Sequence, residues 1–384
     1  MPKGLRIAFF GSSLVSAYWN GAATYYRGLV RALHERGHHI TFYEPDAFSR
    51  QQHRDMDDPA WARVVVYGAQ TEAEVLQTVA RARGADVVIK ASGVGVFDAL
   101  LEEAVLELQG PTTRVLFLDV DAPATLDRLE QNTADPFRAL IPRYDLVLTY
   151  GGGPPVIQAY GAAGARVCVP IYNALDPQTH HPASPDPRFA ADLGFLGNRL
   201  PDREARVEQF FLLAASKLPE RRFLLGGNGW QDKPMPANVH YAGHVYTHQH
   251  NSFNSTPLAV LNINRESMAR YGYSPPTRVF EAAGAGACLI TDEWVGLDLF
   301  LEPEREVLVA RDGEAVAEHL RQLNTDRARA IGKAAYERIL AEHTYAHRAE
   351  LMEQVLEGHG PKNKLRLIPE EVVHSADAPV CTRA

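Results

Sequence analysis

The chain has 384 residues, of which 46% are hydrophobic and 22% are charged. This balance is typical of a folded globular protein and excludes a disordered or fibrous chain, and the length predicts two domains with separate cores. The formal net charge of -8 predicts no general attraction to nucleic acid or to an anionic membrane surface.

Neither the cysteines nor the histidines form a metal-binding pattern. Cys168, Cys288 and Cys381 lie far apart in the sequence, which favours a reducing, cytoplasmic environment. The His248-Gln249-His250 segment lacks the i, i+4 spacing of a zinc pair, so we expect no metal. Only a short apolar run precedes Ser12, which is too short for a secretory signal, and no run of about eighteen apolar residues predicts a membrane span.

In the first half of the chain, short apolar runs alternate with amphipathic helical patterns. This alternation predicts a parallel sheet with helices on both faces. A proline-rich connector over residues 176–187 then interrupts it. The expected strands are residues 5–10, 39–43, 63–67, 85–90, 114–118, 145–149 and 166–169, and the expected helices are residues 22–36, 72–83, 97–108 and 154–162.

The second half repeats the alternation, so the predicted fold class is α/β with two Rossmann-like domains that face each other across a cleft. We expect one domain over residues 1–172, a second over residues 173–358 whose last helix can return to the first, and an unpacked tail over residues 359–384. The expected strands are residues 192–196, 222–225, 239–242, 258–263, 287–291 and 307–310, and the expected helices are residues 202–218, 275–285, 314–323, 325–342 and 346–357.

Ligands of such sheets bind beyond the carboxyl ends of the strands, so the loops carry the candidate residues. Gly11 and Ser12 follow the first strand, where small residues let a ligand approach the backbone or simply form a tight turn. The loop lacks the Gly-x-Gly-x-x-Gly spacing, which argues against a dehydrogenase. Glu44 nevertheless ends the second strand, where a ribose-binding acid of that class would lie.

Two carboxylates, Asp119 and Asp121, end a buried strand of the first half just before Pro123. Asp121 is the candidate general base, because apolar cleft walls raise the pKa of a carboxylate toward neutrality. Either aspartate can instead cap the next helix. The glycines at 151–153 suit a cleft rim or hinge, or a simple turn.

In the second half, Arg199 and Arg265 each follow a strand and compete for the role of phosphate ligand. Either can also be a solvated loop cation. Gly243 and His244 end another strand, where backbone groups can bind the edge of a nucleobase.

The most informative segment runs from Ser274 to Asp292. Ser274 and two prolines start a helix that carries Thr277, Arg278 and Glu281 and ends at a Gly-Ala-Gly stretch. Arg278 and Glu281 can form an ordinary surface ion pair. Alternatively, with the free N–H groups of the helix start they make a site for a polyanion that carries hydroxyls, such as a nucleotide sugar.

Residues 274–292, with Gly296-Leu297 and Glu306-Val307-Leu308, resemble the C-terminal donor domain of CgeB-like (spore-maturation type) glycosyltransferases of GT-B fold. Residues 119–123 are similar to an element of the N-terminal, acceptor-side domain of such proteins. The resemblance spans most of residues 1–357. It implies transfer of a sugar from a nucleotide diphosphate donor to an unidentified acceptor without a metal or other cofactor. It also implies that Glu281 holds the donor ribose and that N–H groups at 276–278 hold the pyrophosphate.

One position departs from related retaining enzymes. A second glutamate lies eight residues before the ribose glutamate in that group, and here the position is Tyr273. The departure leaves retention or inversion open, together with the acceptor and the oligomeric state. Two other functions stay possible on sequence grounds, a sugar-nucleotide epimerase and a non-catalytic nucleotide-sugar-binding or assembly protein.

Overall fold

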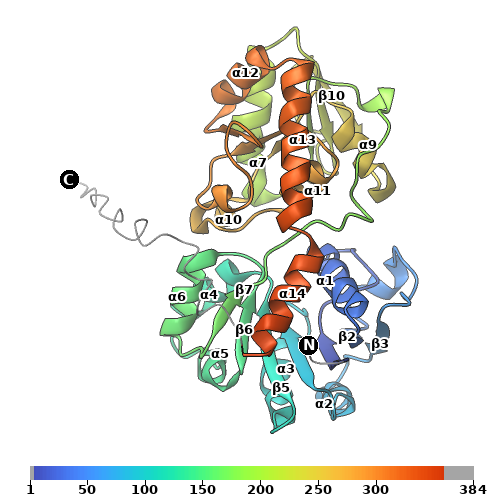
Figure 1. Ribbon diagram of the computed structural model, residues 1–384, viewed down its shortest axis with the longest axis vertical. Coiled ribbons are helices and arrows are strands. Elements are labelled where there is room, and N and C mark those ends of the chain that lie inside the picture. The colour runs from blue at the N-terminus through green and yellow to red at the C-terminus, as the bar shows by residue number, and fades with distance from the viewer. Residues whose placement is uncertain (1–3, 359–384) are drawn as a thin grey trace, which may run out of the picture.

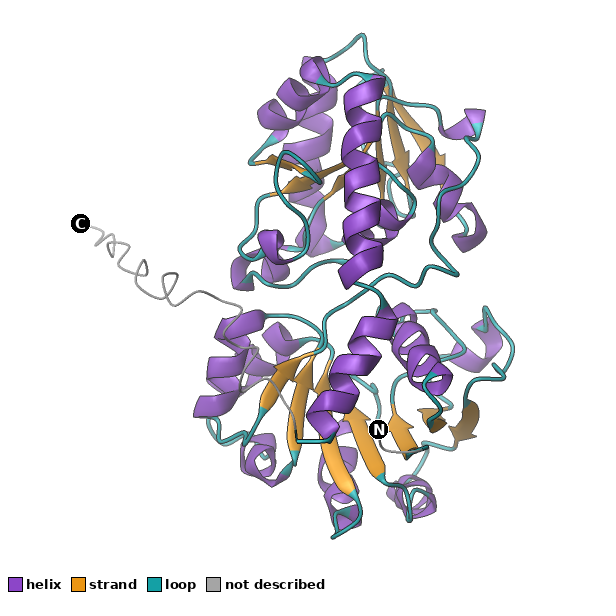
Figure 2. Cartoon of the chain, viewed as in Figure 1, coloured by secondary structure: helices purple, strands orange, loops and turns teal. Residues whose placement is uncertain are grey.

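The polypeptide forms two α/β domains, each built around a parallel sheet. The computed structural model describes residues 4–358, and the two domains stand one above the other in Figure 1. Helices flank the strands in both domains (Figure 2). The predicted fold class is therefore confirmed. The predictions for Cys381 and for residues 359–384 lie outside the described residues.

The first sheet contains seven parallel strands in the order β3-β2-β1-β4-β5-β6-β7. The chain order reverses between the first and fourth strands, and such a switch point is where open α/β sheets bind ligands. The strands are β1 (Arg6–Phe10), β2 (His39–Pro45), β3 (Arg63–Tyr67), β4 (Val87–Ala91), β5 (Arg114–Asp119), β6 (Leu146–Thr149) and β7 (Cys168–Pro170). The helices are α1 (Ala23–Glu35), α2 (Glu72–Arg81), α3 (Asp98–Ala104), α4 (Ala122–Gln131), α5 (Phe137–Leu140) and α6 (Gly153–Ala162).

The second sheet contains six parallel strands in the order β10-β9-β8-β11-β12-β13. Its switch point lies between the strands that begin at residues 193 and 259. The strands are β8 (Leu193–Leu196), β9 (Phe223–Gly226), β10 (Val239–Gly243), β11 (Ala259–Asn262), β12 (Leu289–Asp292) and β13 (Leu308–Ala310). The helices are α7 (Pro201–Val207), α8 (Leu213–Lys217), α9 (His250–Ser255), α10 (Glu266–Tyr271), α11 (Thr277–Gly284), α12 (Gly313–Gln322), α13 (Thr325–Glu342) and α14 (Tyr345–Leu356).

The structure corrects the predicted helix over residues 202–218. A π-helical turn, Glu208–Leu212, separates α7 from α8. Because a π turn changes the helical phase, the consecutive Phe210 and Phe211 are both buried, with 3% and 0% of their surfaces exposed. Helices α5, α9 and α10 were not predicted, because each has only four to six residues and its apolar repeat is too brief to detect. Helix α4 has ten residues and is the helix after Asp121 whose cap was expected, although its bounds were not predicted.

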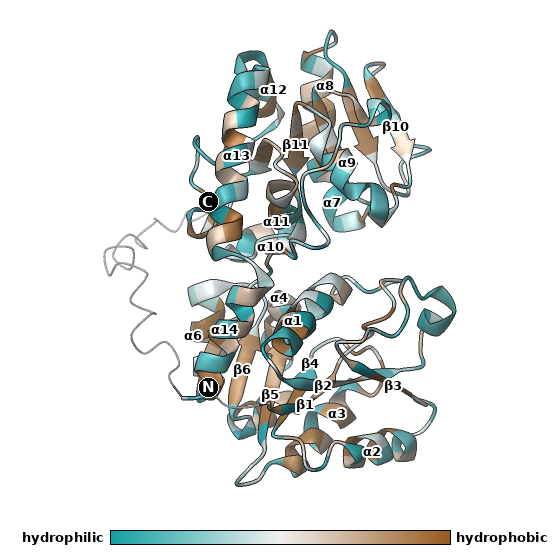
Figure 3. Cartoon of the chain, turned by 45° about the vertical axis from the view of Figure 1, so that its right-hand side comes forward, coloured by the Kyte–Doolittle hydropathy of each residue, from teal (hydrophilic) through white to brown (hydrophobic). Residues whose placement is uncertain are grey.

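Separate apolar cores cover both faces of each sheet. Most strands are largely brown on the hydropathy scale of Figure 3, whereas the helices carry both teal and brown residues. Cys168 and Cys288 are buried free thiols within these cores. Among residues 4–358, no helix combines the length and apolar character needed to cross a membrane.

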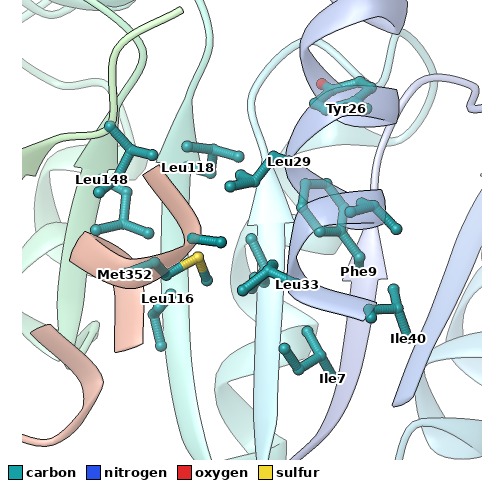
Figure 4. Packing of buried hydrophobic residues seen from close by; sticks show 14 of the residues in the cluster. Ile7, Phe9, Tyr26, Leu29, Leu33, Ile40, Leu116, Leu118, Leu148 and Met352 are labelled. Carbon is teal, nitrogen blue, oxygen red and sulfur yellow. The ribbon is translucent and has the colours of Figure 1, made fainter. Parts of the chain in front are cut away.

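The chain passes between the domains twice, and the two crossings are hydrogen-bonded to each other. The Leu175 N–H donates to the His343 carbonyl at 2.8 Å, and the Tyr345 N–H donates to the Leu175 carbonyl at 3.0 Å. After the second crossing, α14 packs on α1, and its Met352 lies among first-domain residues such as Leu116 and Leu148 (Figure 4). The C-terminal helix therefore completes the core of the N-terminal domain.

Candidate active site

A pocket of about 310 Å³ lies in the cleft where loops of both domains meet. We call it the cleft pocket. Loops after β1, β2, β4, β5 and β6 supply its first-domain wall, so it lies beyond the carboxyl ends of the strands, as the fold predicts. That wall includes Ser12, Trp19, Arg50, Gly93, Asp121 and Tyr150, and the second-domain wall is formed by Arg265, Met268 and Ser274.

A smaller pocket of about 70 Å³ adjoins the cleft pocket inside the second domain. We call it the arginine pocket, because Arg203, Arg265 and Arg278 line it. Thr277 and Pro276, at the start of α11, form another part of its wall. The two pockets share Arg265 and Met268, so a ligand in one reaches the edge of the other.

Two of these arginines have no carboxylate partner. No acidic side chain of residues 4–358 lies within ion-pair distance of Arg203 or Arg278, and the Arg203 Nε is buried without a hydrogen-bond partner. Burial and the neighbouring Arg278 lower the pKa of Arg203 to about 10, and burial lowers the pKa of Arg278. Two desolvated cations side by side repel each other, so the pocket is built for an anion.

The third arginine is paired. Arg265 Nε donates to Asp202 Oδ2 at 2.5 Å, and the Arg265 side chain also faces Asp121 electrostatically. Arg265 therefore links the arginine pocket to the first-domain wall of the cleft.

The start of α11 lies at the arginine pocket. The helix begins at Thr277, two residues later than predicted. Its N-cap residue, Pro276, supplies no side-chain hydrogen bond to the helix. Unsatisfied N–H groups and the helix dipole favour negative charge at such an end. Ser274, just before it, is buried and its Oγ has no partner. This buried hydroxyl can therefore donate a hydrogen bond to a group that enters the cleft.

Asp121 follows β5 and opens onto the cleft pocket. Its Oδ1 accepts a long hydrogen bond of 3.5 Å from the Ala124 N–H, so it also caps α4. Desolvation by the cleft walls raises its pKa, and Asp119 raises it further, whereas Arg265 lowers it. Asp121 is therefore the cap of α4 and also a residue of the cleft pocket, and its role as a general base stays a prediction.

Asp119 is fully buried behind Asp121. Its Oδ1 accepts hydrogen bonds from Ser92 Oγ at 2.8 Å and Thr125 Oγ1 at 3.1 Å, and its Oδ2 accepts one from Tyr160 Oη at 2.5 Å. These bonds hold the carboxylate rigidly. Asp119 is therefore a structural support of the loop and does not reach the pocket.

Glu281 projects from α11, and 15% of its side chain is exposed. Its Oε1 lies 4.0 Å from His180 Nε2 in the interdomain connector. Although burial alone would raise its pKa, His180, Arg278 and His250 together lower it. Arg278 and Glu281 lie farther apart than an ion-pair contact, which excludes the simple surface pair. Glu281 is thus an ionised acceptor of hydrogen bonds beside the arginine pocket.

Arg199 does not face the arginine pocket. Its guanidinium donates to Glu204 Oε1 at 2.7 Å and to Asp232 Oδ1 at 3.0 Å. The arginine that points into the pocket is Arg203, one turn later in the chain. Arg203 was not among the predicted site residues, and no sequence pattern indicated that Asp232, 33 residues from Arg199, would pair with Arg199.

Gly243 and His244 line neither pocket. The Gly243 backbone is left-handed, with φ of 70°, and its carbonyl accepts from the Gly227 N–H at 2.8 Å. His244 is exposed, with its Nδ1 3.2 Å from Asn228 Nδ2. Both lie at the end of β10, on the rim of the second domain.

Gly11 and Ser12 have different roles. A Cβ at Gly11 would lie 2.5 Å from Phe42 Cζ, so the glycine allows core packing. Ser12 lines the cleft pocket and donates from Oγ to Asn20 Oδ1 at 2.8 Å. Trp19 and Arg50 also line that wall, and the sequence analysis did not single them out. No sequence pattern singles them out, because the exposure of Trp19 and the burial of Arg50 appear only in the fold.

The glycine loop before α6 touches the second domain directly. The Gly152 N–H donates to the Tyr273 carbonyl at 2.7 Å. A Cβ at Gly153 would lie 2.6 Å from the Tyr273 Cβ, and one at Gly151 would lie 3.0 Å from Ser274 Oγ. The glycines therefore permit a close contact between the domains, next to the pocket residues Ser274 and Arg278. Within residues 4–358, no group of His, Cys, Asp or Glu side chains is arranged to hold a metal ion.

The second domain matches a known family. Residues 203–354 match the family model described as glycosyl transferase-like. A comparison with curated proteins found no match.

Solved structures resemble the whole described chain. Sucrose-phosphate synthase from Thermosynechococcus elongatus has a TM-score of 0.66 at 15% identity, covering 92% of this chain and 99% of that one. Anabaena HepE in complex with UDP-glucose has a TM-score of 0.64 at 12% identity, covering 92% and 100%. An α-glucosyltransferase in complex with UDP-glucose and DNA containing an abasic site has a TM-score of 0.65 at 13% identity, covering 92% and 100%. The chain has the two-domain fold of GT-B glycosyltransferases.

Proposed function

We propose that the protein is a glycosyltransferase that moves a sugar from a nucleotide diphosphate donor to an acceptor hydroxyl. The observation that carries the proposal is the pair Arg203 and Arg278, which face a pocket without carboxylate partners beside the start of α11. The family match over residues 203–354 and the likeness to structures that contain UDP-glucose support it.

The donor diphosphate binds in the arginine pocket. The two guanidinium groups and the free N–H groups at the start of α11 meet its negative charge. Ser274 Oγ, which has no protein partner, donates to a phosphate oxygen. This arrangement lets cationic side chains stabilise the leaving group, so we propose a reaction that needs no metal ion.

Glu281 accepts hydrogen bonds from the ribose hydroxyls of the donor. Its lowered pKa keeps it ionised and acceptor-only near neutral pH. The base lies toward the end of β10, near Gly243 and His244. We further propose that the protein is of the CgeB-like type, on the strength of the Ser274–Asp292 segment.

Asp121 takes the proton of the acceptor hydroxyl. The acceptor oxygen then forms a bond to the anomeric carbon, and the bond from that carbon to the β-phosphate oxygen breaks, with its electron pair leaving on the diphosphate. Arg203 and Arg278 stabilise the departing charge. A direct displacement of this kind inverts the anomeric centre, and the absence of a carboxylate at Tyr273 is consistent with it.

Thermal-shift titration with UDP, ADP, GDP and their glucose conjugates tests the donor site. We expect at least one diphosphate to raise the melting temperature in a saturable way, because ligands that bind only the folded state stabilise it. Arg203→Gln and Arg278→Gln should each lower the affinity for that diphosphate by about 10-fold or more, since hydrogen bonds to charged groups contribute about 1.5–3 kcal/mol. Arg199→Gln is the matched control and should leave its affinity unchanged. No stabilisation by any diphosphate would overturn the proposal.

The product of a donor incubation separates the transferase from the alternatives. Slow hydrolysis without acceptor, and transfer when an acceptor is present, is the expected result. Accumulation of an epimerised nucleotide sugar would instead show an epimerase. Binding with no turnover across an acceptor screen would show a nucleotide-sugar-binding protein, an alternative with which Tyr273 is also compatible.

A further inference from the structure

The first-domain wall of the cleft pocket carries an exposed aromatic side chain. Trp19 lines the pocket and 79% of its surface is exposed. Trp230 and Trp294, by contrast, are 0% and 5% exposed, and Trp61 is partly buried. A large apolar ring left open to solvent at a pocket marks a binding surface.

The backbone around Trp19 holds the ring in this position. Trp19 has a left-handed φ of 48°, which is unfavourable for a bulky side chain. The turn is closed by a hydrogen bond of 3.2 Å from the Asn20 N–H to the Ala17 carbonyl, and Asn20 Nδ2 donates to the Ser16 carbonyl at 3.0 Å. The exposed ring is therefore part of a defined loop.

Arg50 lies beneath this loop and also lines the cleft pocket. Its surface is 5% exposed. Its Nη1 donates to the Ser12 carbonyl at 3.2 Å and to the Val94 carbonyl at 3.4 Å, and its Nη2 donates to the Trp19 carbonyl at 3.3 Å. Its Nε is buried without a partner.

The charge of Arg50 has no ion-pair partner among residues 4–358. Glu44 is the carboxylate that acts on it electrostatically, but it lies beyond ion-pair distance and accepts from Ser13 Oγ, the Leu14 N–H and Gln51 Nε2. Burial lowers the pKa of Arg50. A guanidinium buried without a counter-charge is unfavourable unless a ligand supplies one.

We infer that the acceptor is an anionic carbohydrate, whose ring stacks on Trp19 and whose carboxylate or phosphate is bound by Arg50. The inference rests on the proposed function, because it assigns the acceptor to the same cleft pocket that holds Asp121. The indole face is electron-rich and attracts the C–H groups of a sugar ring. The planar fork of a guanidinium suits a carboxylate or a phosphate.

Tryptophan fluorescence provides a direct test, because Trp19 is by far the most exposed tryptophan of the described residues. The protein is titrated with glucuronic acid, glucose 6-phosphate and glucose at constant ionic strength. We expect a saturable change in emission with an anionic sugar, at a Kd about 10-fold or more below that of glucose. Tighter binding of glucuronic acid would show that the site prefers a carboxylate, and tighter binding of glucose 6-phosphate would show that it prefers a phosphate. Equal affinity for glucose, or no binding of either anionic sugar, would overturn the inference.

Variants test whether Trp19 gives the fluorescence signal and whether Arg50 gives the preference for an anionic sugar. Trp19→Phe should abolish the change in emission, whereas Trp61→Phe should retain it. Arg50→Gln should remove the preference for the anionic sugar, measured by calorimetry, and Arg54→Gln on the neighbouring surface is the matched control. Because Arg50 also bonds three carbonyls, Arg50→Lys is the second variant, which keeps the charge and should keep only part of the preference. A preference that survives in Arg50→Gln, or that Arg50→Lys leaves undiminished, would contradict the inference.

The two proposals fail in different ways. Stabilisation by a nucleoside diphosphate without any response to anionic sugars would remove the acceptor assignment alone. A response of Trp19 to anionic sugars without diphosphate binding would remove the transferase proposal and leave an anionic-sugar site of another kind.

Discussion

At the scale of single residues, the arginines of the arginine pocket differ in whether a carboxylate pairs with them. Arg203 and Arg278 face the arginine pocket without carboxylates, whereas Arg265 is divided between Asp202 and Asp121. An unpaired buried cation attracts an anionic ligand, and a shared cation adjusts the acidity of its neighbour. In the proposed mechanism, the same residue type therefore binds the donor diphosphate at two positions and adjusts the pKa of Asp121 at a third.

The pH dependence of transfer tests the role of Asp121. The base acts when deprotonated, so activity should fall as the pH falls through its raised pKa. Arg265 lowers that pKa, so Arg265→Gln should move the acid limb of kcat/KM to higher pH. Asp119 raises it, so Asp119→Asn should move the limb to lower pH.

Asp121→Asn should reduce kcat by about 10²–10⁴-fold, the usual contribution of a general base, with unchanged diphosphate affinity. Glu130→Gln, an exposed change on the same helix α4, is the control. Full activity of Asp121→Asn would assign the base to another group.

At the scale of elements, glycines determine how closely the loops of the two domains approach. Gly153 begins α6 with a left-handed φ of 48° and leaves no room for a Cβ against Tyr273. The contact holds the loop that ends in Ser274 against the first domain, directly beside the start of α11.

Gly153→Ala should destabilise the fold by about 1–3 kcal/mol, because a side chain would be strained there and would collide with Tyr273. Gly161→Ala in the same helix is the matched control, since its Cβ meets nothing within 4 Å. Gly161→Ala should stabilise the fold slightly, by up to about 1 kcal/mol, because alanine has a higher helix propensity than glycine. Chemical denaturation of both variants measures the difference, and equal effects would contradict this account of the loop.

At the scale of the whole molecule, α14 connects the end of the described chain to its first domain. Arg348 on this helix is buried and donates to the carbonyls of Tyr172 at 3.1 Å and Asn173 at 3.3 Å. It also lies 3.0 Å, through Nη2, from His343 Nδ1. The two chain crossings are thus held together at one point, around which the domains are oriented.

Met352→Ala should destabilise the first domain by about 2–5 kcal/mol, because it leaves a cavity among residues that are fully buried. Hydrogen exchange should accelerate in α1, which packs against α14, more than in α13. The exposed Glu350→Ala on the same helix should change stability by less than about 0.5 kcal/mol. Faster exchange confined to α13 would show that α14 belongs energetically to the second domain.

Local patterns predicted much of the fold. The strand over residues 63–67 and the helix over residues 325–342 have the predicted ends, because alternating apolar runs and capping residues act over short distances. The π-helical turn and the short helices escaped prediction, since their stability comes from tertiary contacts. Of the candidate site residues, Ser12, Asp121, Arg265, Thr277, Arg278 and Ser274 line the two pockets, and Gly11, Arg199, Gly243, His244 and Glu281 line neither.

The sequence by itself determined that the chain forms two parallel α/β units and that a helix starts within the segment Ser274–Asp292, because both features depend on patterns of neighbouring residues. Only the tertiary structure decided which arginine is free. Arg199 is paired with Glu204, five residues away, and with Asp232, which only the fold brings close to it, whereas Arg203 has no ion-pair partner among residues 4–358. It also placed Trp19 and Arg50 opposite Ser274 in one pocket. Residues so distant in the chain meet only when two sheets direct their carboxyl ends at the same cleft.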